Sequence, residues 1–209
     1  TTTTPDSNPA NNRDDEPTDV TGLASIGDWV WNDANYNGIQ DVGESGLGGV
    51  EVGLYTSGGS FVVSTTTAAG GYYTFTNLVP GDYYLVFTPT TGYAFSPPDQ
   101  GGDDARDSDA NPLTGRTATT TLISGENDVT WDAGLYEYAS LGDWVWDDAD
   151  ADGIQDVGES GLGGVEVGLY TGAGSLVAST ATDAGGYYTF SNLVPGDYYL
   201  VFTPTTGYA

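Results

Sequence analysis

The sequence contains no cysteine, no histidine and no lysine, and each absence excludes a type of chemistry. Without cysteine there is no disulfide, no thiolate metal site and no thiol nucleophile. Without histidine there is no Ser-His-Asp triad, no imidazole base and no usual zinc site. Without lysine neither Schiff-base chemistry nor a Lys-to-Asn isopeptide crosslink is available. We therefore expect a protein that is not an enzyme.

Positive charge is almost absent as well. Three arginines oppose 30 acidic residues, and the formal net charge is −27. This charge repels nucleic acid and anionic membranes, so neither is an expected partner. No apolar run is long enough for membrane insertion. The first residue is Thr and no signal-peptide pattern remains, so we expect a processed, mature chain. The charge also opposes a compact fold unless bound cations or salt neutralise it.

The residues that are present favour β-structure. The apolar residues are mostly Val, Leu, Ile, Tyr and Trp, accompanied by many Thr and by 32 Gly. This mixture is typical of strands joined by tight turns. We therefore expect an all-β protein.

The chain also repeats itself. Residues 25–94 align without gaps to residues 140–209, and 12 of these 70 positions differ. The first copy continues through residues 95–138, whereas the second has no counterpart of that tail. We expect three parts: a polar N-terminal extension at 1–24, a complete repeat at 25–138, and a second repeat at 139–209 that lacks its last strands.

The complete repeat contains about seven β-rich runs bounded by turn residues, which predicts a β-sandwich. Pro80-Gly81 is typical of a type II turn, in which the glycine takes a positive φ. The second repeat retains five of the runs, which leaves open sheet edges that soluble proteins rarely tolerate. The seven runs are residues 25–31, 50–56, 61–67, 71–78, 81–89, 117–123 and 129–136.

The N-terminal extension resembles the piece that the second repeat lacks. Residues 6–9 (Asp-Ser-Asn-Pro) echo residues 107–112, and residues 19–23 (Asp-Val-Thr-Gly-Leu) echo residues 128–130 and 134–135. One interpretation is a flexible leader, because the segment is polar and rich in Pro, Asn and Asp. The other is that residues 1–24 of one copy complete the last domain of its neighbour, which builds a fibre head to tail. A parent chain with further repeats would remove the need for such a donor.

A twelve-residue acidic loop occurs twice, as DANYNGIQDVGE at residues 33–44 and as DADADGIQDVGE at residues 148–159. It follows the EF-hand calcium loop, with oxygen side chains at positions 1, 3, 5, 9 and 12, glycine at position 6 and a backbone carbonyl at position 7. These hard oxygen ligands suit Ca²⁺ better than Mg²⁺. The expected ligands are Asp33, Asn35, Asn37, Ile39, Asp41 and Glu44, and in the second copy Asp148, Asp150, Asp152, Ile154, Asp156 and Glu159.

The loops differ from helical EF-hands because the runs that flank them look like strands. A calcium sensor that opens a Met-rich groove is disfavoured, since the chain has no methionine. The alternative to a metal site is a solvated turn of Asp, Asn and Gly.

A further acidic cluster follows the first copy of the loop. Asp103, Asp104, Asp107 and Asp109 lie within seven residues and repel one another unless a cation joins them. We expect another calcium site here, and a solvated acidic turn is the alternative. Asp28 and Asp132 lie near strand ends, but their spacing alone does not identify them as ligands.

Together these motifs resemble the calcium-binding B repeats of serine-aspartate repeat (SdrD-like) surface adhesins, which are relatives of the collagen-adhesin B-type domains. The segments that carry the resemblance are residues 27–44, 78–83, 99–104 and 132–135. The resemblance covers residues 25–209. It implies an immunoglobulin-like or prealbumin-like sandwich, several Ca²⁺ ions per repeat held by the two loops and the acidic cluster, and a rod or stalk role outside the cell. The chain departs from the collagen-adhesin branch in having no lysine for an isopeptide bond, and it shows no Ser-Asp tract and no Leu-Pro-x-Thr-Gly anchor.

Two functions remain open on the sequence. The first is a calcium-stiffened structural module of an extracellular or cell-surface fibre, stalk or layer, whose partners are other copies of itself. The second is an adhesin module that binds carbohydrate or a host protein through exposed Trp and Tyr side chains. Catalysis by paired carboxylates is disfavoured, because a bound Ca²⁺ lowers the pKa of its ligands and makes them poor acids and bases.

Overall fold

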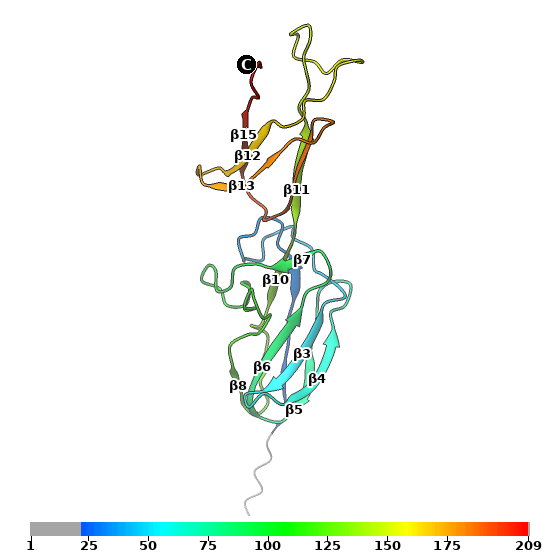
Figure 1. Cartoon of the computed structure of the whole chain (residues 1–209). Helices are drawn as coiled ribbons and strands as arrows, with labels where there is room; N and C mark the ends of the chain where they lie inside the picture. The colour runs from blue at the N-terminus through cyan, green and yellow to red at the C-terminus, as the bar shows by residue number, and fades with distance from the viewer. Residues whose placement is uncertain (1–21, 209) are drawn as a thin grey trace, which may run out of the picture.

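The structure, a computed structural model, describes residues 22–208, so most of the N-terminal extension lies outside the described residues. All regular secondary-structure elements within this range are β-strands, which confirms the all-β prediction. None of the described residues forms a helix that could cross a membrane. Figure 1 shows two groups of strands, and we refer to residues 22–138 as the first unit and to residues 139–208 as the second unit.

The first unit is a β-sandwich whose strands form three small sheets. Their orders are β4-β3-β6-β8, β5-β1-β9 and β2-β10-β7. The strands are β1 (Ala24–Ile26), β2 (Val30–Asn32), β3 (Glu51–Thr56), β4 (Phe61–Thr66), β5 (Phe75–Leu78), β6 (Gly81–Thr88), β7 (Tyr93–Phe95), β8 (Thr120–Leu122), β9 (Asn127–Asp128) and β10 (Ala133–Glu137).

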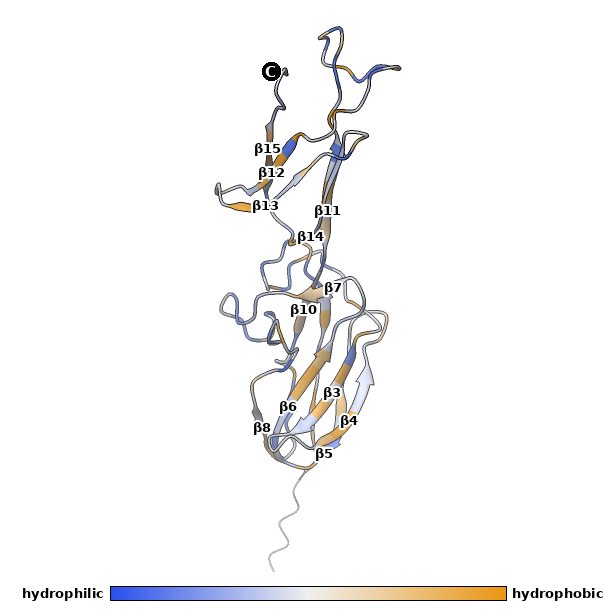
Figure 2. Cartoon of the chain, in the orientation of Figure 1, coloured by the Kyte–Doolittle hydropathy of each residue, from blue (hydrophilic) through white to orange (hydrophobic). Residues whose placement is uncertain are grey.

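Alternating side chains of these sheets meet in one buried core. Leu54 of β3 and Leu85 of β6 pack in the same cluster as Ile26 of β1 and Leu135 of β10. The apolar stretches of β3 and β6 stand out in Figure 2. Because successive residues of a strand point to opposite faces, Leu54 and Leu85 enter the core together with the residues two positions away in β3 and β6, whereas no residue of the edge strand β4 is buried.

The structure refines the expected strands in three places. The run at residues 25–31 is divided into β1 and β2 by Gly27, where a Cβ would lie 2.4 Å from the carbonyl oxygen of Tyr73. The short strands β7 and β9 were not expected. The type II turn expected at Pro80-Gly81 is wrong, because Gly81 already begins β6 and the positive φ in this region belongs to Asn77 (60°).

The second unit repeats the first as far as its sequence goes. It contains β11 (Ala139–Trp144), β12 (Glu166–Thr171), β13 (Leu176–Ala181), β14 (Tyr187–Leu193) and β15 (Tyr198–Thr203), in the sheets β13-β12-β15 and β11-β14. The register is the same in both units, since Ala139 pairs with Leu193 as Ala24 pairs with Leu78. Its smaller core consists of Val167, Leu169, Tyr188, Phe190 and Leu193, with partly buried neighbours.

Three strand edges that are covered in the first unit are open in the second. In the first unit β8 pairs with β6, β9 pairs with β1, and β10 pairs with β2. The corresponding edges of β15, of β11 and of residues 145–147 have no such neighbour among the described residues. The five strands expected for a truncated second repeat are therefore present, together with the exposed edges.

The two units are joined by a very short connection. The last strand of the first unit, β10, ends at Glu137, and the first strand of the second unit, β11, begins at Ala139. In Figure 1 β11 continues upward from β10, and the C-terminus lies at the far end of the second unit. A unit thus passes its last strand directly into the first strand of the next.

Candidate metal centres

The first acidic loop, residues 33–44, begins directly after β2, so the sandwich holds its first ligand position in place. Asp33 is fully buried, and its carboxylate accepts hydrogen bonds from the backbone N–H groups of Gly38 (2.7 Å) and Asn37 (3.2 Å). Gly38 has a φ of +73°, a conformation that glycine adopts without steric cost. The glycine at the sixth position thus makes the sharp turn that closes the loop around Asp33.

The other oxygen-bearing side chains of this loop converge. The carboxylate of Asp41 accepts hydrogen bonds from the side-chain amides of Asn35 (2.8 Å) and Asn37 (2.9 Å). The carboxylate of Glu44 accepts hydrogen bonds from the backbone N–H groups of Ala34 (2.9 Å) and Asp41 (3.0 Å). The side chains of positions 3, 5 and 12 are therefore hydrogen-bonded to Asp41, but the carboxylates of Asp33, Asp41 and Glu44 do not form a group within 4.8 Å of one another, so their ligation of one shared cation stays a prediction.

The second loop, residues 148–159, has the same backbone arrangement. Its first carboxylate, Asp148, accepts hydrogen bonds from the N–H groups of Asp152 (3.1 Å) and Gly153 (2.9 Å). Glu159 accepts hydrogen bonds from the N–H groups of the second and ninth loop positions, at 2.9 and 3.0 Å. Carboxylate oxygens of Asp148, Asp150 and Asp152 lie within 4.8 Å of one another. Three negative charges at this spacing repel strongly unless a cation lies between them.

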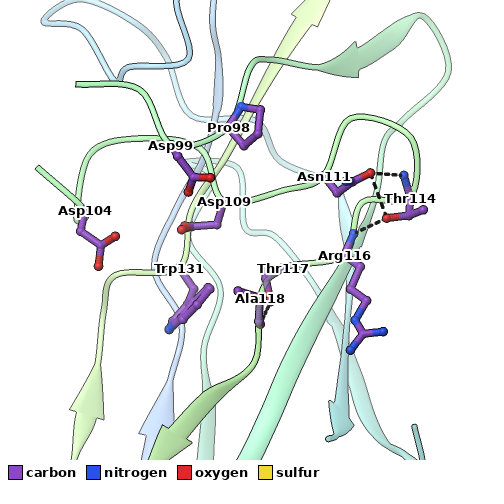
Figure 3. Close-up of a pocket in the computed structure, with 10 residues that line it drawn as sticks. All are labelled: Pro98, Asp99, Asp104, Asp109, Asn111, Thr114, Arg116, Thr117, Ala118 and Trp131. Carbon is purple, nitrogen blue, oxygen red and sulfur yellow. Dashed lines mark hydrogen bonds between the residues drawn. The ribbon is translucent and has the colours of Figure 1, made fainter. Parts of the chain in front are cut away.

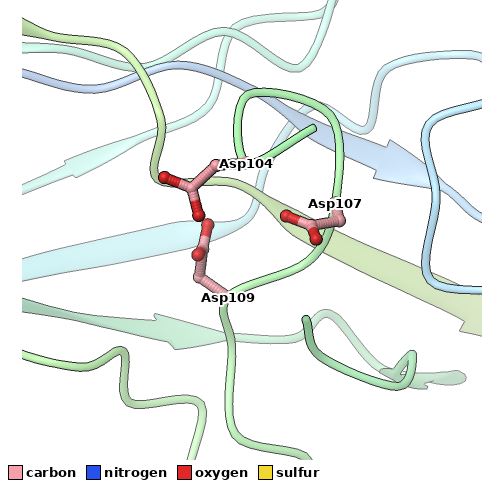
Figure 4. Close-up of side chains that lie close together, drawn as sticks. All are labelled: Asp104, Asp107 and Asp109. Carbon is pink, nitrogen blue, oxygen red and sulfur yellow. The ribbon is translucent and has the colours of Figure 1, made fainter. Parts of the chain in front are cut away.

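A second group of carboxylates, which we call the acidic cluster, forms between β7 and β8. Asp104, Asp107 and Asp109 each offer an oxygen within 4.8 Å of the others, and Figure 4 shows the three side chains gathered around one space. The structure brings together three of the four acids expected here. Asp103 is exposed and outside this group, and its backbone carbonyl accepts a hydrogen bond from the N–H of Arg106 (2.9 Å).

The acidic cluster lies against the first loop. Ile39 and Asp107 face each other in a short antiparallel bridge. The N–H of Gln40 donates to the carbonyl of Arg106 (2.8 Å), and the N–H of Ser108 donates to the carbonyl before Ile39 (3.0 Å). The Arg106 side chain also donates to the carbonyl of Gln40 (2.6 Å). Two oxygen-rich segments far apart in the sequence therefore share one end of the sandwich.

Asp132 is the residue of this region that sequence spacing could not assign. It is 2% exposed, and one carboxylate oxygen accepts a hydrogen bond from the N–H of Trp29 (2.9 Å). Its other oxygen is buried and has no hydrogen-bond partner among the described residues. Backbone bonds tie it to the cluster, because its N–H donates to the Asp109 carboxylate (2.6 Å) and its carbonyl accepts from the Asp109 N–H (2.9 Å).

Burial makes the charged forms of these carboxylates costly in the absence of a cation. Burial, followed by the charges of neighbouring aspartates, raises the pKa of Asp132 to about 9. Burial likewise raises the pKa of Asp109 to about 8, against the lowering effect of its bond from the Asp132 N–H. The pKa of Asp107 is also raised, mainly by burial and next by the charge of Asp104. A carboxylate in this position needs a proton or a metal ion.

The residues fit a hard divalent cation. Asp107 is 7% exposed, and its Oδ1, like the free oxygen of Asp132, has no hydrogen-bond partner among the described residues. The two arginines of residues 22–208 make other contacts: Arg106 donates to a backbone carbonyl, and Arg116 lies over the ring of Tyr84 at 3.8 Å. Unpartnered carboxylate oxygens of this kind are the hard ligands that Ca²⁺ prefers, and Asp107 belongs with Asp104 and Asp109 to a group whose oxygens lie within 4.8 Å of one another.

In chelator, the free energy of unfolding should fall as the pH rises from about 4 to about 9. Folded Asp109 and Asp132 keep their protons up to a pKa of about 8 and about 9, whereas an unfolded aspartate releases its proton near pH 4. The folded state therefore binds more protons in this range, and the associated stability is complete below pH 4 and is lost as the pH rises through the folded pKa values. Urea unfolding at a series of pH values measures this slope.

Two controls decide whether these carboxylates cause the slope. Calcium should remove it, because a bound ion holds the carboxylates in the ionised form. Asp132→Asn should flatten it even in chelator, since the amide oxygen can still accept the hydrogen bond from Trp29 and the side chain cannot ionise. A slope that neither calcium nor this substitution changes would contradict the assignment.

A polar cavity of about 490 Å³ opens beside the acidic cluster. Figure 3 shows the carboxylates of Asp104 and Asp109 on one side of it, the ring of Trp131 below them, and Arg116 with Asn111 on the other side. Carboxylates, an amide, a guanidinium and an aromatic ring in one hollow are groups that can contact a hydroxylated ligand.

Comparison with known proteins identifies the family of the chain. The family described as "SdrD B-like domain" matches residues 24–135 and again residues 139–209. The chain belongs to the SdrD B-like domain family. The family resemblance inferred from the loops, the Pro-Gly-Asp-Tyr segment and the last strands is thereby confirmed.

The SdrD B-like repeats of this chain have curated relatives of similar sequence. Serine-aspartate repeat-containing protein F of Staphylococcus epidermidis is 38% identical over 190 residues, which are 90% of this chain and 11% of that protein. Serine-aspartate repeat-containing protein C of Staphylococcus aureus (strain N315) is 40% identical over 185 residues, which are 88% of this chain and 19% of that protein. The chain thus spans a small part of the relatives it matches.

The solved structures that match the chain are less similar in sequence than these relatives. The TIE protein of Bacillus anthracis matches with a TM-score of 0.39 and 18% identity, over 88% of this chain and 29% of that one. Shaft pilin SpaA of Lactobacillus rhamnosus GG matches with a TM-score of 0.36 and 12% identity, over 90% of this chain and 89% of that one.

Proposed function

We propose that this chain is a calcium-stabilised structural module of an extracellular or cell-surface fibre, stalk or layer. The observation that carries the proposal is the crowding of buried carboxylates at one end of the first sandwich. Asp107 and Asp132 each keep a buried oxygen without a hydrogen-bond partner among the described residues, and both belong to a chain of net charge −27. Such groups are stable together when divalent cations join them.

Each unit would then be stiffened by the ions at its loop end. Ions bound by the first loop and by the acidic cluster tie the segment after β2 to the segment before β8, because these two segments already share backbone hydrogen bonds. A cation held by groups from both segments binds the folded state and has little affinity for the unfolded chain. It therefore stabilises the fold by an amount that rises with the logarithm of its concentration divided by its dissociation constant. Extracellular calcium concentrations suit modules with dissociation constants of about 10⁻⁴–10⁻³ M. The carboxylates serve in this proposal as ligands, and no catalytic step is assigned to them.

We further propose that copies of the chain assemble head to tail, with residues 1–24 of one copy completing the second unit of the next. The three open edges of the second unit support this assembly, because an exposed strand edge presents unpaired N–H and C=O groups to any chain that can add to it. This contact joins two different surfaces, the N-terminal segment of one copy and the second unit of the next, so it is heterologous. Its repetition produces an open filament.

Electron microscopy of the purified chain, with calcium and with chelator, tests the proposed function. We expect filaments or long rods in millimolar calcium and dispersed, shorter particles after chelation. Identical particles under both conditions would contradict calcium-dependent stiffening and assembly.

A binding module for carbohydrate or for a host protein is the second candidate. Two observations favour it: the polar cavity lined by Asp104, Asp109 and Trp131, and an aromatic pair, at least partly exposed, that recurs in both units. The rings of Trp29 and Tyr72 are stacked with centroids 5.6 Å apart, and those of Trp144 and Tyr187 lie 5.2 Å apart. Binding of the isolated chain to a glycan array would favour this candidate.

A further inference from the structure

The first unit shows how a segment without a long strand covers the edge of β6. Val86 of β6 faces Arg116 in an antiparallel bridge. The N–H of Phe87 donates to the carbonyl of Gly115 (2.9 Å), and the N–H of Thr117 donates to the carbonyl of Leu85 (3.0 Å). Residues 111–117, which we call the edge segment, thereby close this part of the sheet.

The edge segment is anchored by one cation and one asparagine. The Arg116 guanidinium lies over the ring of Tyr84 at 3.8 Å, and Tyr84 is itself stacked on Tyr55 with ring centroids 5.3 Å apart. The side-chain oxygen of Asn111 accepts hydrogen bonds from the N–H groups of Leu113 (3.0 Å) and Thr114 (3.2 Å), which shapes the turn before the arginine. Figure 3 shows Asn111 and Arg116 at opposite ends of this turn.

The second unit has the same aromatic platform without its cover. Tyr199 is stacked on Tyr170 with centroids 5.3 Å apart and the ring planes 9° from parallel. Tyr199 is 44% exposed, whereas its counterpart Tyr84 is 9% exposed. Phe202 is also 44% exposed, although its counterpart Phe87 is 2% exposed. A cavity of about 570 Å³ is lined in part by Phe202.

The N-terminal extension repeats the spacing of asparagine, proline and arginine found in the edge segment. Asn8-Pro9-Ala10-Asn11-Asn12-Arg13 matches Asn111-Pro112-Leu113-Thr114-Gly115-Arg116 in its asparagine, its proline and its arginine, without a gap. Arg13 is the only cationic side chain of residues 1–24 in a chain of net charge −27.

The one position that changes unfavourably is the glycine before the arginine. Gly115 has a φ of +67°, and a Cβ at this position would lie 2.1 Å from the carbonyl oxygen of Phe87. Its counterpart, Asn12, is a residue type that tolerates a positive φ. The open edge of β15 must shift outward to admit it, which is easier for a strand that is paired on one side alone.

We propose that Arg13 of a second copy stacks on Tyr199, and that residues 8–14 of that copy lie along the edge of β15 as the edge segment lies along β6. This inference rests on the head-to-tail assembly proposed above and names its contact. In this register Arg13 faces Val201, as Arg116 faces Val86. In this contact the guanidinium of Arg13 covers the solvated ring face of Tyr199. Such a cation–π interaction strengthens as water is excluded from the site.

The test compares the concentration needed for assembly of the full chain in millimolar calcium, measured by sedimentation velocity, for four variants. Arg13→Gln and Tyr199→Leu should each raise this concentration about 2- to 30-fold, the range expected for one cation–π contact. The double variant should show little more than either single change, because both remove the same interaction. Arg116→Gln removes the equivalent contact inside the first unit and should leave the assembly concentration unchanged.

Disulfide trapping tests the register independently of the energy. The chain has no cysteine, so Arg13→Cys with Val201→Cys introduces the only two thiols. Mild oxidation in calcium should produce a ladder of covalent oligomers, and the control pair Arg13→Cys with Thr203→Cys should produce far less. One outcome is that the unmodified chain assembles while Arg13→Gln has no effect and no ladder forms. That result would overturn the Arg13–Tyr199 contact and leave the head-to-tail assembly standing. An unmodified chain that stays monomeric in calcium would overturn the assembly itself.

Discussion

Chelating divalent cations should lower the melting temperature of the first unit by about 10–30 °C at low ionic strength. A cation present at ten to a hundred times its dissociation constant stabilises the fold by about 1.4–2.7 kcal/mol per site. Two sites in the first unit therefore contribute about 3–5 kcal/mol, and each kcal/mol corresponds to a few degrees in a domain of this size. Differential scanning calorimetry in calcium and in chelator measures the change.

Salt provides the matched control for this melting experiment. Sodium chloride at about 1 M screens charges over roughly 3 Å, so it should recover part of the loss by weakening repulsion without occupying a site. Calcium should recover all of it at millimolar concentration, and magnesium should recover less because it demands a stricter octahedral arrangement. If sodium chloride and calcium were equally effective at the same millimolar concentration, general screening would replace specific binding as the explanation.

Deleting residues 1–21 should abolish assembly in calcium. The deletion keeps every described strand and every described core residue, so the melting temperature of the first unit should stay within about 2 °C of the full chain. The physical reason for the loss of assembly is that the edges of β15 and β11 then have no strand to pair with. Light scattering and electron microscopy of both chains measure the difference.

A chain extended at its C-terminus is the complementary control. Appending a copy of residues 95–138 after Ala209 supplies the strands that the second unit lacks within the same molecule. This extended chain should remain monomeric, and its second unit should melt at a higher temperature than in the original chain. Filaments formed by the deleted chain, or by the extended one, would show that assembly uses another surface.

Much of the fold could be predicted from the sequence because strand signals are local. The alternation of apolar and polar residues in residues 50–56 and 81–89 places Leu54 and Leu85 in the core, and the structure has strands β3 and β6 there. The internal repeat extends the same reasoning to the second unit without further evidence. The break between β1 and β2 could not be predicted, because it depends on the close approach of Gly27 to the backbone of Tyr73.

In the candidate site, too, local features could be predicted from the sequence and long-range contacts could not. The spacing of the acidic loop predicts its local hydrogen bonds, because Asp33, Gly38 and Glu44 belong to one twelve-residue loop: Asp33 accepts from the N–H of Gly38, and Glu44 accepts from the N–H of Ala34. The contact of this loop with the acidic cluster is different, since it depends on how distant segments fold together. Asp132 illustrates the limit: a single aspartate just before a strand has no local pattern, and its importance follows from its burial beside Asp109.

The truncated second unit shows what an internal repeat can reveal. The repeat predicts five strands for residues 139–209, because these residues match the part of the first copy that holds its first five strand-like runs. The side chains that are more exposed than their counterparts in the first unit are Tyr199 and Phe202, and the sequence does not identify them. The match between Arg13 and Arg116 becomes meaningful once Arg116 is seen to lie on an aromatic ring.

Isothermal titration of calcium into the metal-free chain tests the central claim most directly. The two loops and the acidic cluster predict at least three bound ions per chain, with dissociation constants at or below about 10⁻³ M. Asp33→Ala should remove one of them, because this carboxylate holds the first position of the first loop. A chain that binds no calcium at millimolar concentration, and keeps its fold at low ionic strength, would contradict the account.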